Sequence, residues 1–185
     1  MRRFIPFFGA AVFGCMACYG AGVGFPPAKT CISPDLKWTI RCVSEDQRDG
    51  TTRRTLLLSR LGSSEGVAIW FTERSCDVLW QDDGPQIAIT DWTGSSIAEI
   101  FLVEAPGTTK ARRLEIQNVK TFVHTDELDG HIYHEALKWE SDHELLIRIF
   151  GHTDENPSHG FAYYLSVNVE SQIAKLVRKA DAEEG

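Results

Sequence analysis

The chain lacks several patterns that define common protein classes. The apolar run at its N-terminus, residues 4–17, is shorter than the ~20 residues that a membrane-spanning helix needs, so we expect no stable membrane span. Beyond residue 22 there is no Cys-x-x-Cys, which excludes a thioredoxin-like redox motif and a zinc ribbon. His-Glu-x-x-His, the helical ligand pair of zincin metalloproteases, is also missing.

Positive charge is scarce. The chain has 19 Lys and Arg against 26 Asp and Glu, and all the acidic residues but only 17 of the basic ones lie beyond residue 22. The charge of that part is therefore near −9 (17 basic minus 26 acidic residues). A domain with this negative charge lacks the basic surface that attracts nucleic acid or an anionic membrane. We expect no nucleic-acid partner and no cofactor.

The N-terminus has the plan of a secretory signal peptide. Two arginines precede the apolar run, and small residues follow it at 18–24. We expect residues 1–22 to be a signal helix that is removed on export, with the mature protein in a bacterial periplasm. Cys15 and Cys18 raise the alternative of a lipoprotein, but Phe13 places a bulky ring where the lipoprotein pattern has a small residue.

A polar turn with an acidic residue, followed by an apolar strand, occurs three times, at residues 33–40, 81–88 and 140–147. Further short β-prone runs between Gly, Pro, Asp and Ser residues follow each copy, as is typical of antiparallel all-β folds. The equivalent aspartates would be Asp35, Asp83 and Asp142. Their spacings of 48 and 59 residues lie near the ~40–50 of a propeller blade.

We therefore predict a single all-β repeat domain over residues 23–178 and a charged tail over residues 179–185. Its three consecutive antiparallel blade-like units form either a propeller-like array or an open β array. Short opening strands at 77–80 and 136–139 would make each unit four-stranded. The insertion at 118–134 would form a helical turn or a long loop.

Residues 33–38 (Ser-Pro-Asp-x-Lys-Trp) and 77–84 (Asp-Val-Leu-Trp-Gln-Asp-Asp-Gly) resemble the opening turn of blades in TolB-type, WD-like β-propellers. The usual form in that family is Trp-Ser-Pro-Asp-Gly-Lys, and residues 99–104 resemble the next strand of a blade. The resemblance covers about three quarters of the chain and implies a scaffold, since the family includes binding platforms, periplasmic assembly factors and peptidase accessory domains. Closed propellers have 4–8 blades. Three units instead favour an open array, a sheet packed on itself, or two chains that complete one another.

Three cysteines remain beyond the signal peptide, so at most one internal disulfide can form. Export to an oxidising compartment favours such a bridge. Cys31 and Cys76 each come a few residues before the turn that opens a repeat, which makes them the candidate pair. Cys42 would keep a thiol.

The densest set of metal-ligating residue types lies in the insertion. His131 and His134 could reach one metal ion from a helical turn, and His124 and Asp126 complete the set of candidate ligands. The alternative is a solvated polar insertion, which we favour because the spacing matches no zincin pattern.

Residues 62–66 and the tryptophans are further candidates for a functional role. Residues 62–66 fit Gly-x-Ser-x-Gly, but the β-prone run at 67–71 follows where a nucleophile elbow needs a helix, so we expect a hairpin turn. Trp80 and Trp139 precede equivalent turns and are expected in the core. Trp92 follows the second repeat in a turn and is the candidate for a binding surface.

The leading hypothesis is a secreted, non-enzymatic module that binds a protein or peptide partner, or another copy of itself. The alternative is a small metal-dependent or serine hydrolase of the cell envelope, which would use the histidine-rich insertion or the serine of residues 62–66.

Overall fold

The computed structural model describes residues 22–82, 84, 86–104, 110–158 and 160–181. The fold is mostly β, as predicted, and its strands form two open sheets, one with four strands and one with nine. None of the helices among the described residues is long and apolar enough to cross a membrane. The predicted signal helix, Cys15, Cys18 and Asp83 lie outside the described residues.

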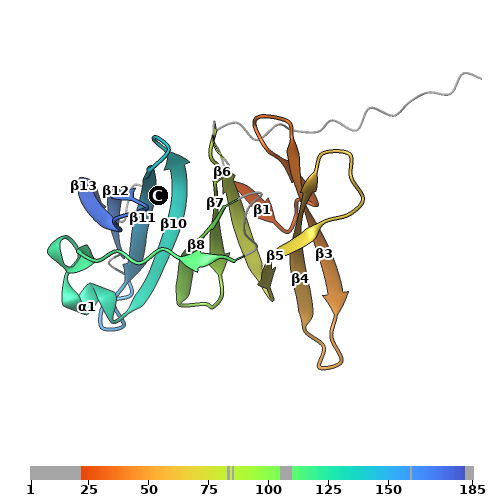
Figure 1. The fold of residues 1–185 in the computed structure, drawn as a ribbon. Helices are drawn as coiled ribbons and strands as arrows, with labels where there is room; N and C mark the ends of the chain where they lie inside the picture. Colours follow the sequence, from red (N-terminus) through yellow and green to blue (C-terminus); the bar gives the residue numbers. More distant parts are fainter. Residues whose placement is uncertain (1–21, 83, 85, 105–109, 159, 182–185) are drawn as a thin grey trace, which may run out of the picture.

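The strands follow one another as three antiparallel meanders (Figure 1). The first meander is the four-stranded sheet, with β2 (Thr30–Ile32), β3 (Trp38–Asp46), β4 (Thr52–Arg60) and β5 (Val67–Thr72). The second has β6 (Ser75–Trp80), β7 (Gln86–Trp92), β8 (Ile97–Glu104) and the short β9 (Arg112–Arg113). The third has β10 (His131–Trp139), β11 (Glu144–His152), β12 (Gly160–Asn168) and β13 (Ile173–Asp181).

Two further pairings complete the larger sheet. β1 (Val23–Phe25) adds to the free side of β6. β8 and β10 pair in parallel through two residue pairs, Ile132 with Ile97 and Tyr133 with Ala98. This short contact joins the second and third meanders into one mixed sheet, although each meander is antiparallel within itself.

The second meander is buried on both faces. β7 contains five consecutive buried residues, and their side chains alternate between two apolar clusters. Ile87 and Ile89 belong to the cluster shared with the first meander, whereas Ala88 belongs to the cluster shared with the third. A strand with both faces covered needs apolar residues at successive positions. The three meanders therefore pack face to face, with the second in the middle.

A backbone hydrogen bond closes the turn that opens each meander. The amide of Ser33 donates to the carbonyl of Trp38 at 2.9 Å, and the amide of Gln81 donates to that of Gln86 at 2.9 Å. In the third meander the amide of Glu140 donates to the carbonyl of Glu144 at 2.8 Å, so this turn is one residue shorter than the other two. The equivalence of the three copies stays a prediction.

Asp35 behaves as the turn chemistry predicts. The Asp35 carboxylate accepts the amide of Lys37 at 3.0 Å and the hydroxyl of Ser33 at 2.7 Å. These bonds, that of Ser33 above all, hold the pKa of Asp35 below its ordinary value. Asp142 lies between β10 and β11, outside any helix.

Two boundaries differ from the prediction. β10 begins at His131 and not near residue 136, because it pairs with β11 along its length and with β8 at its start. β13 continues to Asp181, so pairing with β12 places residues 179–181 of the predicted charged tail in a strand. The insertion before β10 holds a 3-10 turn (Val119–Thr121) and a one-turn helix, α1 (Thr125–Leu128), which agrees with the predicted helical turn.

The two tryptophans that precede equivalent turns lie in the core, as predicted. Trp80 is 4% exposed and Trp139 is 5% exposed. The indole N–H of Trp139 donates to the carbonyl of Leu79 at 3.5 Å, a contact from the third meander to the second. These rings fill the space between neighbouring meanders.

Candidate functional site

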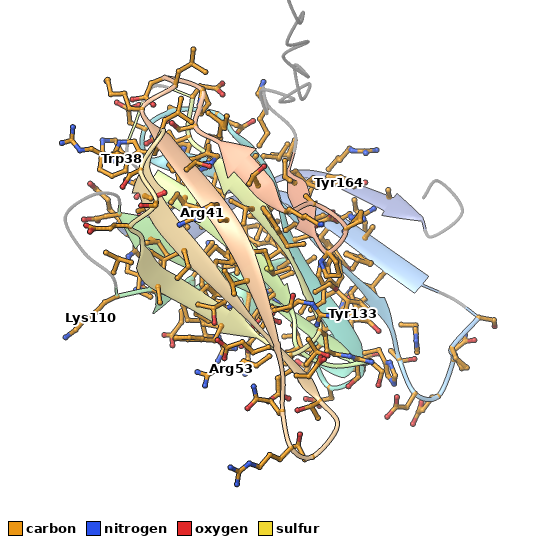
Figure 2. The ribbon with its side chains drawn as sticks, turned by 90° about the vertical axis from the view of Figure 1, so that its right-hand side faces the viewer. Trp38, Arg41, Arg53, Lys110, Tyr133 and Tyr164 are labelled. Atoms are coloured by element: carbon orange, nitrogen blue, oxygen red, sulfur yellow. The ribbon has the colours of Figure 1, made fainter. Side chains whose placement is uncertain are left out.

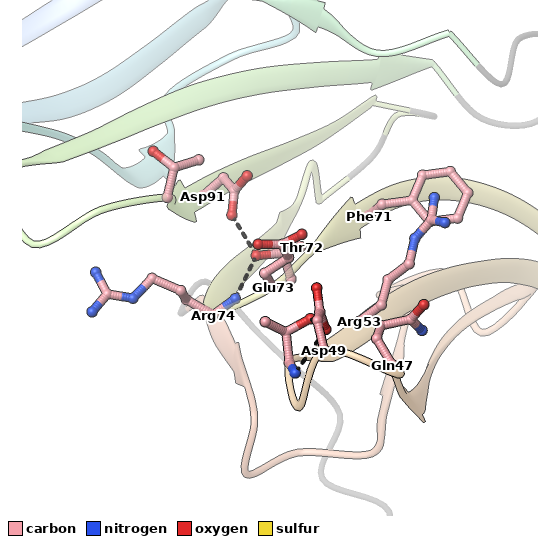
Figure 3. Close-up of a pocket in the computed structure, with 10 residues that line it drawn as sticks. Gln47, Asp49, Arg53, Phe71, Thr72, Glu73, Arg74 and Asp91 are labelled. Atoms are coloured by element: carbon pink, nitrogen blue, oxygen red, sulfur yellow. Dashed lines mark hydrogen bonds between the residues drawn. The ribbon is translucent and has the colours of Figure 1, made fainter.

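The structure has an open pocket of about 480 Å³ where one end of the first meander meets the second (Figure 3). Three segments of the chain line it: the β3–β4 hairpin, the end of β5 with the turn into β6, and the end of β7. The described lining residues are Gln47, Asp49, Thr51, Arg53, Phe71, Thr72, Glu73, Arg74, Asp91 and Thr93.

Asp91 is the most deeply buried group of this pocket. Its residue is 3% exposed, and its carboxylate accepts the hydroxyl of Thr72 at 2.8 Å. Burial raises the pKa of Asp91, although the bond from Thr72 opposes the rise. A carboxylate has about four acceptor positions, so Asp91 retains capacity for an N–H donor or an ammonium group of a ligand.

The turn between β5 and β6 is held in place by its neighbours. The Arg54 guanidinium donates to the carbonyls of Glu73 at 2.9 Å and Arg74 at 2.8 Å. The amide of Arg74 donates to the Thr72 hydroxyl at 3.3 Å. The Thr72 hydroxyl therefore links the turn between β5 and β6 to Asp91. These hydrogen bonds hold the pocket wall in position without a ligand.

The mouth of the pocket carries charges of both signs. The Arg53 guanidinium lies over the Phe71 ring, 4.2 Å from its centroid. Opposite, the exposed Asp49 accepts the amide of Thr51 at 3.0 Å and its hydroxyl at 2.7 Å. The amide bond above all lowers the pKa of Asp49, so the group is an anion at neutral pH. The arrangement suits recognition of a short polar segment next to an aromatic surface.

None of the residues predicted as metal ligands lines this pocket, and they do not converge elsewhere. Among the described residues, no three His, Cys, Asp or Glu side chains gather closely enough to hold a metal ion. His124 and Asp126 lie at the exposed start of α1, where the amide of His124 donates to Glu127 at 2.9 Å. This is a helix-capping contact.

His131 and His134 lie on a strand, so the helical spacing assumed for them is wrong. Residues three apart on a strand point to opposite faces. The His131 ring stacks on that of His152 with centroids 4.4 Å apart, and its Nε2 lies 3.6 Å from Asp154. Burial, with a smaller effect of Arg113, lowers the pKa of His134 to about 4. His134 is therefore neutral at pH 7.

Trp92 ends β7 and is partly buried. Its indole N–H donates to the Asp77 carboxylate at 2.6 Å. Its ring centroid lies 6.1 Å from that of Tyr133 and 6.4 Å from that of Phe150. Its contacts tie the second meander to the third, and its role in binding stays a prediction.

The candidate disulfide also stays a prediction. Cys31 on β2 and Cys76 on β6 are both buried in the cluster between the first and second meanders. In its thiol form Cys76 has a pKa raised to about 12, mainly by burial and next by the nearby Asp91 carboxylate.

Residues 62–66 form the loop between β4 and β5, and the strand Val67–Thr72 follows them, as predicted. The helix that a nucleophile elbow requires is replaced by this strand.

The pocket itself was not predicted. One signal for it exists in the sequence, because Asp91 is a carboxylate within the apolar run of β7. Its hydrogen-bond partner Thr72 and the lining residue Arg53 lie on other strands, and no local sequence pattern marks them. Comparison of the sequence with models of known protein families gives no match, and comparison with curated proteins gives none either.

Proposed function

We propose that the protein is an exported, non-enzymatic module that binds an extended segment of a protein or peptide partner, on a scaffold of three blade-like units. Each meander has four strands and an opening turn closed by a backbone hydrogen bond, which supports the blade-like interpretation. The resemblance to TolB-type propellers at residues 33–38 and 77–84 agrees with it.

The observation that carries the binding function is the edge strand β5. It stands at the end of the four-stranded sheet and, among the described residues, pairs with β4 alone. Its sequence, Val-Ala-Ile-Trp-Phe-Thr, has no charge and no proline, the devices that usually block such an edge. Backbone groups of an open edge can hydrogen-bond an added strand.

The pocket lies at the C-terminal end of this edge. A segment paired along β5 would bring a side chain to Asp91, whose free acceptor positions suit an ammonium, guanidinium or amide group. Arg53 and Phe71 would lie at the mouth of the pocket. Backbone pairing would supply affinity, and the pocket would select the residue.

A library of displayed seven-residue peptides, selected on the immobilised full chain, tests this function. Fluorescence anisotropy then gives the affinity of a selected peptide. We expect Val67→Lys, which places a charge on the β5 edge, to weaken binding about tenfold, which corresponds to about 1.4 kcal/mol. Asp91→Asn should relax the preference for a basic or amide residue.

The matched control is Val177→Lys on β13. Val67 is 54% exposed and Val177 is 55% exposed, and both lie on edge strands. The control should bind the selected peptide as the unmodified chain does. Equal loss of affinity in the two variants would count against β5 as the binding edge, and a failure to select any peptide would count against the function.

A further inference from the structure

A second open pocket, of about 330 Å³, lies at the other end of the first meander from the pocket at Asp91. Figure 2 shows Trp38 and Arg53 toward opposite ends of this sheet. The strand register agrees, because Trp38 pairs with Arg60 at one end of β4 and Arg53 pairs with Glu45 near the other. The turn that opens β3 and the end of β4 supply the lining residues: Leu36, Lys37, Trp38, Arg60 and Leu61.

Leu36 holds an unfavourable backbone conformation in this pocket. Its φ is 59°, in the left-handed region, where a side chain crowds the backbone and glycine is favoured. The side chain is nevertheless large and apolar, and it is 56% exposed. Strain at a residue that is not glycine is characteristic of functional sites. A glycine would form this turn without strain and would expose no apolar surface, so neither the turn nor the core accounts for the leucine.

The exposed apolar surface of the pocket is aliphatic. Leu61, beside Leu36 in the lining, is 45% exposed. Trp38 is partly buried and packs against the cluster between the first and second meanders, and the Arg60 guanidinium lies 5.4 Å from the centroid of its ring. The core and Arg60 thus already use the indole, whereas the two leucines face solvent. Such a surface suits an alkyl chain, whose burial needs no directional contact, better than an aromatic ligand that needs a ring to stack on.

The pocket carries one uncompensated positive charge. The Nζ of Lys37 lies 3.0 Å from the Asp35 carboxylate, so these two charges offset one another. Arg60 is exposed, and none of the described carboxylates forms an ion pair with it. Its planar guanidinium has five N–H donors, which match the geometry of a carboxylate. The pocket therefore attracts an anionic head group although the domain as a whole is acidic.

The backbone amides at this pocket are already used. Those of Leu36 and Trp38 both donate to Ser33, to its carbonyl at 3.0 Å and to its hydroxyl at 2.9 Å. The amide of Leu61 donates to the Lys37 carbonyl at 2.8 Å, and that of Lys37 donates to the carboxylate of the turn at 3.0 Å. A peptide that is held by strand pairing, or by capture of its terminal carboxylate, needs free backbone groups. These amides are not available to it, so the side chains select the ligand.

We propose that this pocket binds a fatty acid as its free carboxylate. The alkyl chain lies against Leu36, Leu61 and Trp38. The carboxylate pairs with Arg60. The volume of the pocket lies within the ~300–1,000 Å³ of small-molecule sites.

The ligand is a free amphiphile and not a lipid surface, because the net negative charge of the domain opposes adsorption to an anionic bilayer. This inference goes beyond the proposed function. The fatty-acid pocket and the pocket at Asp91 share no described lining residue, and the β5 edge remains open to the peptide.

Isothermal titration calorimetry of the full chain with octanoate, decanoate and dodecanoate, each below its micellar concentration, tests the proposal. Each added methylene group that the pocket buries should tighten Kd about two- to fourfold. Decyltrimethylammonium has a tail of the same length as decanoate but a positive head group. It should bind about tenfold more weakly than decanoate or worse, because its charge would face Arg60.

Leu36→Gly separates a role in binding from a role in folding. The variant should bind decanoate about tenfold more weakly, because it loses apolar contact with the chain. It should not have a lower Tm, since glycine adopts the left-handed conformation without strain. The matched control is Gln172→Gly, because Gln172 also has a φ of 59° and lies outside the pocket. The control should bind decanoate as the unmodified chain does. Arg60→Gln should abolish the preference for decanoate over decyltrimethylammonium.

The proposal is overturned if none of the three fatty acids binds, if Kd does not depend on chain length, or if Leu36→Gly binds decanoate as tightly as the unmodified chain. Cosedimentation with dioleoylphosphatidylglycerol vesicles, without binding of free decanoate, would also overturn it in favour of a membrane surface. Peptide binding at the β5 edge should persist in Leu36→Gly. Failure of the fatty-acid site and failure of the proposed function therefore give different results.

Discussion

The burial of β7 against the first meander can be tested by removing one carbon from a side chain. Ile89 is fully buried in the cluster between the first and second meanders. Ile89→Val removes one carbon and leaves a small cavity, at a cost of about 0.5–1.5 kcal/mol in the free energy of unfolding. For a domain of this size, 1 kcal/mol lowers Tm by roughly 2–4 °C. We expect a Tm decrease of about 1–6 °C for this variant.

The chain contains a matched control on an outer strand. Ile173 on β13 is 43% exposed, so Ile173→Val should change the free energy of unfolding by less than about 0.5 kcal/mol. Both variants are measured by differential scanning calorimetry at one protein concentration, which removes any effect of association on Tm. A cost at Ile173 as large as that at Ile89 would refute the burial of this face of β7 against the first meander.

A second variant tests whether the two clusters are separate. Ile149 is fully buried in the cluster between the second and third meanders. The costs of Ile89→Val and Ile149→Val should add to within about 0.5 kcal/mol, as is usual for sites without shared partners. A larger coupling energy would mean that the residues share one core.

Two other predictions follow from His134 and from the N-terminus. The pKa of His134 is about 4 in the folded state against about 6.5 in the unfolded state, so the unfolded chain binds more protons between these pH values. The free energy of unfolding should therefore fall by up to about 3 kcal/mol as the pH drops from about 6.5 to 4. His134→Gln should reduce this pH dependence, and urea titrations of both proteins at pH 7 and pH 4.5 measure it. N-terminal sequencing of the protein from its native host should show a start near residue 23, and an intact Met1 on the soluble protein would contradict export.

The strands of the fold were open to prediction because their patterns are local. The apolar run Leu145-Leu146-Ile147 and the turn at Asp35 each depend on neighbours within a few residues. The start of β10 was missed for the opposite reason. His131 and its neighbours look like a polar insertion, and they become a strand only because β8 and β11 offer hydrogen-bonding partners from distant parts of the chain.

The candidate site was less accessible to prediction than the fold. Asp91, Thr72 and Arg53 come from three strands, and their proximity depends on how the first meander packs on the second. The helical spacing assumed for His131 and His134 was wrong for a related reason, because pairing with β8 and β11 makes this segment a strand, on which residues three apart point to opposite faces.

The burial patterns of the strands also differ between the middle meander and an outer one. β7 is apolar at successive positions because both of its faces are covered. β12 alternates strictly between buried and partly buried residues, as expected for a strand with one covered face. Yet Leu146 and Tyr164 occupy the uncovered face, where solvent alone would favour polar side chains. Leu146 is partly buried, whereas Leu145, Ile147 and Ile149 on the opposite face of β11 are fully buried. The strand is therefore apolar at successive positions although, among the described residues, another meander covers one of its faces.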